Sequence, residues 1–276
     1  MIVFLTKTAL GTLVAYLLGY NPLWGITAVI AVWVLTLLTR LMWGAYKYAH
    51  TPSHAYGPRA LARTPLSHAH PRNTFGSPGT SLNTSGFDQN SIDAGQAGEQ
   101  QLFAALIKEN IITSRTTCSA WSCPIPQQGT PVADPKYSSD IDAIIVRGRT
   151  IYVIDAKRWA GGNNVTYKRK NGGVWRFVDG QPKQIMHLSH NMEMATDRIS
   201  SIVGPGYKVR GFVCVMPTEK GAARIAPFTF APGHIPVVSP RFLITLIKSR
   251  PALLPVLPKT RTVFQTLAFS RKTKVA

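Results

Sequence analysis

The sequence predicts an α/β domain built on a mixed sheet, preceded by a membrane anchor and a polar linker. Three observations lead to this prediction. Residues 8–39 contain no charged side chain, residues 50–93 show no sustained apolar period, and from residue 94 onward apolar runs alternate between helical and strand periods. The predicted parts are an anchor at 1–48, a disordered linker at 49–93, a folded domain at 94–250 and a basic tail at 251–276.

The uncharged run predicts a transmembrane helical hairpin. As one helix it would be about 48 Å long, well beyond the roughly 30 Å hydrocarbon core of a bilayer. Asn21-Pro22 interrupts it, so we expect two passes, at about 2–18 and 23–44, with a single pass as the alternative. Lys7 lies early in the first pass and could reach back to its N-terminal side, and Arg40 and Lys47 lie at the end of the second, so both ends of the hairpin are expected in the cytoplasm. The lipid bilayer of the inner (plasma) membrane is therefore an expected partner, with the soluble domain in the cytoplasm.

The linker, the cysteines and the charge narrow the class of protein. Residues 49–93 are rich in Pro, Gly, Ser, Thr and Asn, which predicts a flexible segment. Three cysteines cannot form a disulfide framework, which excludes a disulfide-built secreted fold. The chain has 31 Lys plus Arg against 12 Asp plus Glu, a formal net charge of +19, so we expect a polyanionic partner: nucleic acid or an anionic membrane surface.

The periodicity places the elements of the domain in order. We expect a helix at 93–110 with Asp93 as N-cap, and strands at 141–146 and 151–156. A hairpin at 165–177 would turn at Asn171-Gly172, followed by a long helix at 181–203. A strand at 209–216, a short helix at 240–248 and a loose segment at 259–276 complete the chain.

Three acidic residues and one lysine stand where the pattern does not expect charge. Glu99 continues the apolar stripe of the first helix backwards, which aims its carboxylate at the inner face. A two-residue type II′ turn at Gly148-Arg149 would set Asp142 directly opposite Asp155 in the next strand. Lys157, two residues later, would share their face.

Facing carboxylates inside a sheet indicate a cation. Like charges opposite each other are destabilising, and a divalent ion removes the repulsion. Mg²⁺ prefers oxygen ligands and is commonly held by two carboxylates and several waters. The sequence thus predicts a Mg²⁺ (or Mn²⁺) site at Asp142 and Asp155 with Glu99 assisting, and Lys157 beside it to orient a water or stabilise a phosphate.

These residues carry a resemblance to a known family. Gly95-x-x-Gly98-Glu99, then residues 139–146 around Asp142, then residues 152–161 around Asp155-Ala156-Lys157, resemble the nuclease-related domain (NERD) family over about residues 94–250. Residues 181–184, ending in Gln184, are similar to an element that opens the family's next helix. The resemblance implies a restriction-endonuclease-like fold of the PD-(D/E)xK superfamily. It also implies catalytic roles for Glu99, Asp142, Asp155 and Lys157, with Gln184 as an accessory helix residue at the site.

A basic hairpin offers a second functional candidate. Lys168, Arg169 and Lys170 have aromatic neighbours at Tyr167, Trp175 and Phe177, a combination that could track a phosphate backbone and stack on bases. Arg158, next to the predicted site, is a further candidate contact to nucleic acid.

Three functional hypotheses remain open. The first hypothesis is a membrane-anchored, Mg²⁺-dependent nuclease that hydrolyses phosphodiester bonds, with DNA as the expected substrate from the family resemblance. The alternative is a catalytically inactive nuclease fold that binds nucleic acid or a protein partner at the membrane. A third hypothesis is a membrane-scaffold role carried by the N-terminal transmembrane hairpin alone.

Overall fold

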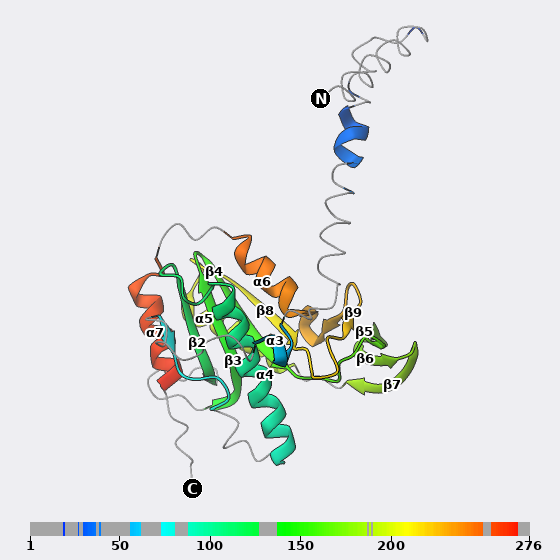
Figure 1. The fold of residues 1–276 in the computed structure, drawn as a ribbon. Helices are drawn as coiled ribbons and strands as arrows, with labels where there is room; N and C mark the ends of the chain where they lie inside the picture. The colour runs from blue at the N-terminus through cyan, green and yellow to red at the C-terminus, as the bar shows by residue number, and fades with distance from the viewer. Residues whose placement is uncertain are drawn as a thin grey trace. The chain divides into compact units, whose positions relative to one another are not determined.

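The computed structural model describes residues 19, 27, 30–36, 39, 56–61, 73–80, 88–126, 137–186, 188, 190–250 and 255–269 (Figure 1). The chain divides into two compact units, Met1–Tyr48 and Ala49–Ala276. In the first unit, residues 30–36 are helical. The predicted pass at 2–18 and much of the pass at 23–44 lie outside the described residues. Across the residues that are described, no helix is both long enough and apolar enough to cross a bilayer.

The second unit is built on a seven-stranded mixed sheet with the order β1-β2-β3-β4-β8-β11-β10. The predicted α/β class with a mixed sheet is thereby confirmed. Two of its central strands, β4 and β8, are parallel, whereas β3 runs antiparallel to β4. The strands are β1 Thr74–Phe75, β2 Thr117–Pro126, β3 Tyr137–Arg147, β4 Thr150–Lys157, β8 Lys208–Val215, β10 Phe230–Ala231 and β11 Ile235–Val238.

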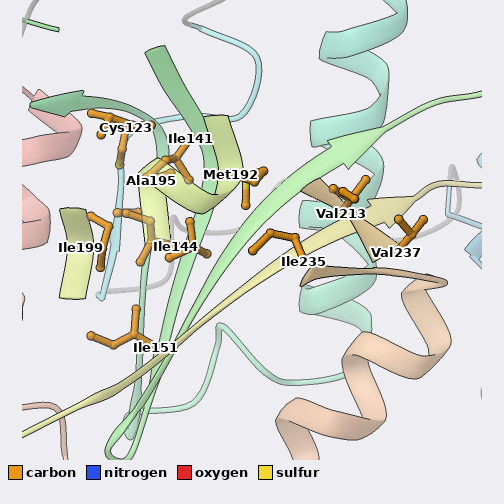
Figure 2. Close-up of a cluster of buried hydrophobic side chains, with 14 of the residues drawn as sticks. Cys123, Ile141, Ile144, Ile151, Met192, Ala195, Ile199, Val213, Ile235 and Val237 are labelled. Atoms are coloured by element: carbon orange, nitrogen blue, oxygen red, sulfur yellow. The ribbon is translucent and has the colours of Figure 1, made fainter. Parts of the chain in front are cut away.

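Helices cover both faces of this sheet and enclose two apolar cores. On one face, α4 (Gln89–Lys108) and α6 (Pro240–Lys248) bury Leu102, Leu106 and Leu243 against the strands. On the other face, α5 (Asn191–Val203) and α7 (Pro258–Phe269) contribute their own apolar side chains, and Figure 2 shows Met192, Ala195 and Ile199 of α5 packed over the strands. A short helix, α3 (Pro58–Leu61), and a 3-10 turn, η3 (Pro232–His234), complete the helical elements.

A smaller four-stranded sheet has the order β7-β6-β5-β9; β5, β6 and β7 lie between β4 and α5 in the chain, and β9 follows β8. Its strands are β5 Val165–Lys170, β6 Gly173–Val178, β7 Gln181–Met186 and β9 Arg224–Ile225. Asn171 and Gly172 both have positive φ, 50° and 76°, as the predicted two-residue turn between β5 and β6 requires. The predicted hairpin is therefore confirmed.

The turn between β3 and β4 also agrees with the type II′ turn that the sequence predicts. Gly148 has a φ of 57° and Arg149 is not among the residues of positive φ, as in a type II′ turn. Arg147 pairs with Thr150, and the ladder continues to Ala143 opposite Ile154. The predicted register, on which the positions of Asp142 and Asp155 depend, is confirmed.

Three element predictions need correction. The first helix begins earlier, because Asp88 and not Asp93 is its N-cap and accepts the N–H of Ser91 at 3.0 Å. The predicted helix 181–203 is a strand up to Met186 and a helix only from Asn191, since β7 completes the small sheet beside β6. The segment 259–276, expected to be loose, contains α7 up to Phe269.

The predicted linker also needs correction where it is described. Tyr56 and Leu61 are buried in one core, and β1 adds a parallel strand to β2, with Thr74 opposite Ser119. Polar composition had suggested that this stretch could not fold alone. Where the structure describes it, its apolar side chains Tyr56, Leu61 and Phe75 are buried against the domain that follows.

A glycine in this stretch gives a test of its folded state. Gly76 has a φ of 70°, and a Cβ there would lie 2.5 Å from the backbone oxygen of Trp121. We expect Gly76→Ala to lower the free energy of unfolding by about 2–5 kcal/mol, through left-handed strain and the clash together. Gly180→Ala is the control, because Gly180 also has positive φ but has no atom near its Cβ position. Equal chemical denaturation curves for the two variants would contradict the packing of residues 73–80 against β2.

Candidate active site

The candidate site lies where β3 and β4 separate. Their paired residues end at Ala143 and Ile154, although β3 begins at Tyr137 and β4 continues to Lys157. Beyond that point the Asp142 side chain takes the place of a backbone partner, because its Oδ2 accepts the N–H of Ala156 at 2.7 Å. This bond fixes the Asp142 carboxylate beside the end of β4.

Asp155 and Lys157 project from that end of β4. Lys157 Nζ lies 2.6 Å from Asp155 Oδ1, and the two side chains are 37% and 16% exposed. Burial opposes the charged ammonium, but Asp155 and Asp142 outweigh this effect and raise the pKa of Lys157. Lys157 is therefore a fixed cation with part of its surface open to solvent.

Asp142 and Asp155 interact directly, as their predicted positions required. Burial is the largest cause that raises the pKa of Asp142 well above its usual value. The charge of Asp155 and a hydrogen bond to it act in the same direction, whereas Lys157 lowers the pKa. A single ammonium thus does not compensate the pair of carboxylates fully.

Glu99 reaches the same site from α4. Glu99 is 1% exposed, and its Oε2 accepts the N–H of Gly79 at 2.7 Å. Burial raises the pKa of Glu99 to about 7 against the hydrogen bonds from Gly79 and Ser122, and the charges of Lys157 and Asp155 also act on it. The other carboxylate oxygen, Oε1, is buried and has no hydrogen-bond partner among the described residues.

Two residues at this site were missed in the sequence. Gly79 lies in the predicted linker, and Ser122 lies in β2, opposite the separation of β3 from β4. Ser122 has a φ of 49°, and its Oγ lies 3.1 Å from Glu99 Oε2 and 3.0 Å from the backbone oxygen of Ser77. The turn-forming residues of 76–79 were a signal for an ordered turn, but nothing in the sequence indicated that this turn would meet Glu99.

Ser122 gives a test of how Glu99 is held. We expect Ser122→Ala to lower the free energy of unfolding by about 1 kcal/mol and to raise the pKa of Glu99, because the hydroxyl donor that favours the carboxylate is removed. Urea denaturation between pH 5 and 9 measures both effects. Ser201→Ala is the control, since its hydroxyl only bonds Asp197 O on an exposed helix surface. A Ser122 variant with the wild-type stability at every pH would contradict the contact.

The other predicted residues lie on the small sheet or next to Lys157. Gln184 belongs to β7 of the small sheet, opposite Arg176, and not to the start of a helix. Only its backbone is described, so its accessory role stays a prediction. Arg158 follows Lys157 but forms an ion pair with Glu219. Lys168, Arg169 and Lys170 are exposed on β5.

A cavity of about 530 Å³ lies apart from this site. It is bounded mainly by β8, β10, β11 and α6, and its lining includes Phe212, Phe230 and Phe242. None of the three clustered acids lines it. The cluster of Glu99, Asp142, Asp155 and Lys157 therefore lies outside this cavity.

The donor set fits a hard divalent cation in its chemistry. It consists of carboxylate oxygens, one of which is buried and unpartnered, and two of its carboxyl pKa values are raised by burial and mutual repulsion. Among the residues that the structure describes, no group of three or more His, Cys, Asp or Glu is placed to hold a metal ion together. The ligand set of Asp142, Asp155 and Glu99 remains a prediction.

The structure thus shows an α/β fold with three acids and a lysine near the point where two central strands separate. Residues 94–216 match the nuclease-related domain (NERD) family, so the chain carries a nuclease-related domain in this stretch. This range contains Glu99, Asp142, Asp155 and Lys157, as the resemblance of the motifs predicted. No curated protein and no solved structure gave a significant match.

Proposed function

We propose that the domain is a metal-dependent nuclease that hydrolyses phosphodiester bonds at the site of Glu99, Asp142, Asp155 and Lys157. The observation that carries the proposal is the convergence of Asp142, Asp155 and the partly exposed Lys157 where β3 and β4 separate. The match of residues 94–216 to a nuclease-related family supports the same reaction class. The basic excess of the chain suits a polyanionic substrate.

In this proposal Asp142 and Asp155 hold Mg²⁺ or Mn²⁺, with Glu99 Oε1 as an assisting group. The bound ion supplies a nucleophilic water of lowered pKa and neutralises charge on the scissile phosphate. Asp142 stays oriented by its bond from Ala156 N–H, and Glu99 by its bond from Gly79 N–H. Lys157, held by Asp155, places a cation beside the phosphate and stabilises the charge that develops there.

The experiment is hydrolysis of labelled single-stranded and duplex DNA and RNA by the full chain, with Mg²⁺, with Mn²⁺ and with EDTA. We expect cleavage with either ion and none with EDTA, and we expect DNA to be the preferred substrate. Asp142→Asn keeps an oxygen that can accept the Ala156 N–H but loses the charge, so it should fold and not cleave. Wild-type cleavage by this variant, or cleavage in EDTA, would contradict the proposal.

The second candidate is a nuclease fold that binds nucleic acid, or a protein partner at the membrane, without chemistry. One observation favours it: Glu99 Oε2 already accepts the N–H of Gly79, which leaves one oxygen of Glu99 for other ligands. Tight binding of nucleic acid, with no cleavage under any of the metal conditions above, would select this candidate over the enzyme.

We further propose that the chain acts at the cytoplasmic face of the inner membrane, through the apolar N-terminal segment. The absence of charge between residues 8 and 39 supports attachment to a membrane, as do the exposed side chains of Val32, Trp33 and Leu35 in the described helical stretch. Membrane fractionation of the full chain, before and after a high-salt wash, tests it. Release of the protein by salt alone would contradict an apolar anchor.

A further inference from the structure

The small sheet has an exposed face that combines aromatic rings with cations. Side chains alternate between faces along a strand, so Lys168 and Lys170 of β5 share a face with Trp175 and Phe177 of β6. Lys168 is directly opposite Trp175. Arg224 of β9 is paired with Thr166, which adds a third cation to this face. We call these five residues, Lys168, Lys170, Trp175, Phe177 and Arg224, the outer face.

The opposite face of the same sheet is already used for packing. Val165, Tyr167 and Val174 are buried in the apolar core, and Tyr167 lies against Trp159 with ring centroids 5.0 Å apart. Lys168, Lys170 and Arg224 are exposed, whereas Trp175 and Phe177 are half-buried. The outer face therefore carries side chains that the fold itself does not need to enclose.

Flexible ammonium groups lie over both aromatic rings. Lys168 Nζ lies 4.9 Å from the centroid of Phe177, and Lys170 Nζ lies 4.8 Å from that of Trp175. Such exposed cation–π contacts are weak, about 0.5–1 kcal/mol each, so a planar ligand can displace the ammonium groups. A ligand that brings its own anions would then give each displaced cation a new partner.

The positive charge of the small sheet favours an anionic ligand. As described, its four strands contain six Lys or Arg residues and no Asp or Glu. A face with cations beside rings suits an anionic chain with planar groups, which is the chemistry of nucleic acid. Trp175 and Phe177 stand two residues apart on one strand, about 6.6 Å, so they can receive two separate bases.

The outer face also adjoins the candidate active site along the chain. Only residues 158–164 separate Lys157 from β5. Within this connection, Ala160 O accepts the Tyr167 hydroxyl at 2.9 Å, and Trp159 packs on the same Tyr167 ring. A nucleic-acid strand bound on β5 and β6 would therefore lie on a sheet that is fixed to the segment following Lys157.

We propose that the outer face binds single-stranded nucleic acid, with Trp175 and Phe177 as stacking platforms and Lys168, Lys170 and Arg224 as phosphate contacts. The inference rests on the proposed function for its class of ligand, and it adds the strandedness. Bases in a duplex are stacked on each other and present no free ring face, whereas single-stranded bases can stack on aromatic side chains. The surface thus favours single strands over duplexes of equal length.

The test is equilibrium binding of fluorescein-labelled oligonucleotides to the full chain in EDTA, measured by anisotropy, so that the result does not depend on hydrolysis. We expect a 20-nucleotide single strand to bind at least about tenfold more tightly than its duplex. Trp175→Ala should weaken single-strand binding by about 5- to 100-fold, and Trp175→Phe should restore most of it. Lys168→Gln with Lys170→Gln should weaken binding and reduce its salt dependence.

The matched control is Lys208→Gln with Lys259→Gln, which removes the same charge at two exposed positions outside the small sheet. The proposal would be overturned if the Lys168/Lys170 and Lys208/Lys259 variants lost equal binding affinity, or if the duplex bound more tightly than the single strand. Unchanged binding by a folded Trp175→Ala variant would also overturn it. So would preferential binding of the outer face to anionic phospholipid vesicles, lost in the Trp175 and Lys168/Lys170 variants. Single-strand binding without cleavage would reject the nuclease and retain this surface, whereas cleavage that the outer-face variants do not alter would do the reverse.

Discussion

Asp155→Asn is expected to reduce the rate of phosphodiester cleavage by about 10³-fold or more. The substitution removes one of the two anionic ligands proposed for the metal, and the loss of several kcal/mol of charge stabilisation corresponds to this factor. It also removes the anion that holds Lys157 Nζ at 2.6 Å. Metal-dependent turnover of a labelled oligonucleotide, under single-turnover conditions, measures the effect.

A variant of Lys157 and a control variant separate the role of the lysine from that of the metal ligands. Lys157→Met should lower the cleavage rate by about 10²–10³-fold while leaving Mn²⁺ binding largely intact, because the lysine acts on the phosphate and not on the ion. Asp197→Asn is the control, since Asp197 is an exposed carboxylate on α5. An Asp155 variant as active as this control would exclude the site from the reaction.

The metal-free protein is expected to lose stability as pH rises from about 4.5 to about 7. Glu99 has a pKa raised from 4.5 to about 7 by burial, so the folded state binds its proton more tightly than the unfolded state does. The folded state therefore holds more protons within this window, and the free energy of unfolding falls with increasing pH. For Glu99 alone the loss is about 3 kcal/mol, and Asp142 has a shift of the same sign.

Glu99→Gln isolates this contribution. A neutral amide does not bring a charge into the protein interior. The free energy of unfolding of the variant should therefore depend less on pH and exceed that of the wild type at pH 8 without metal. Urea denaturation in EDTA at several pH values measures it, with Asp197→Asn as the exposed-carboxylate control. Added Mg²⁺ should stabilise the wild type at pH 8 and stabilise Asp142→Asn much less. Wild-type stability that rises with pH over this window would contradict the burial of Glu99.

The positions of Asp142 and Asp155 were predictable because they depend on local chemistry. A glycine at the first position of a two-residue turn sets the register of the hairpin, and the register sets which side chains face each other. Glu99 was predictable because its helix has a clear apolar stripe. In each case the informative residues lie within about twenty positions of one another.

The remaining features depend on contacts between distant parts of the chain. Gly79 and Ser122 meet Glu99 only after β1 pairs with β2, and the composition of the polar stretch gives no sign of this pairing. Residues 181–186 have no strong strand pattern, and they become β7 because β6 offers an unpaired edge. α7 forms in a basic segment because Phe264 and Leu267 find a place in the core.

The turn that holds Glu99 has a practical consequence for dissecting this protein. A fragment cut at the limits of the family match, 94–216, would begin after Gly79 and end before α6 and α7. It would expose β2 as an open sheet edge, which invites aggregation, and it would leave the Glu99 carboxylate without its amide donor. Inactivity of so short a fragment would thus reflect a damaged fold rather than missing catalytic residues, whereas residues 49–269 keep β1, the turn at Gly79, α6 and α7.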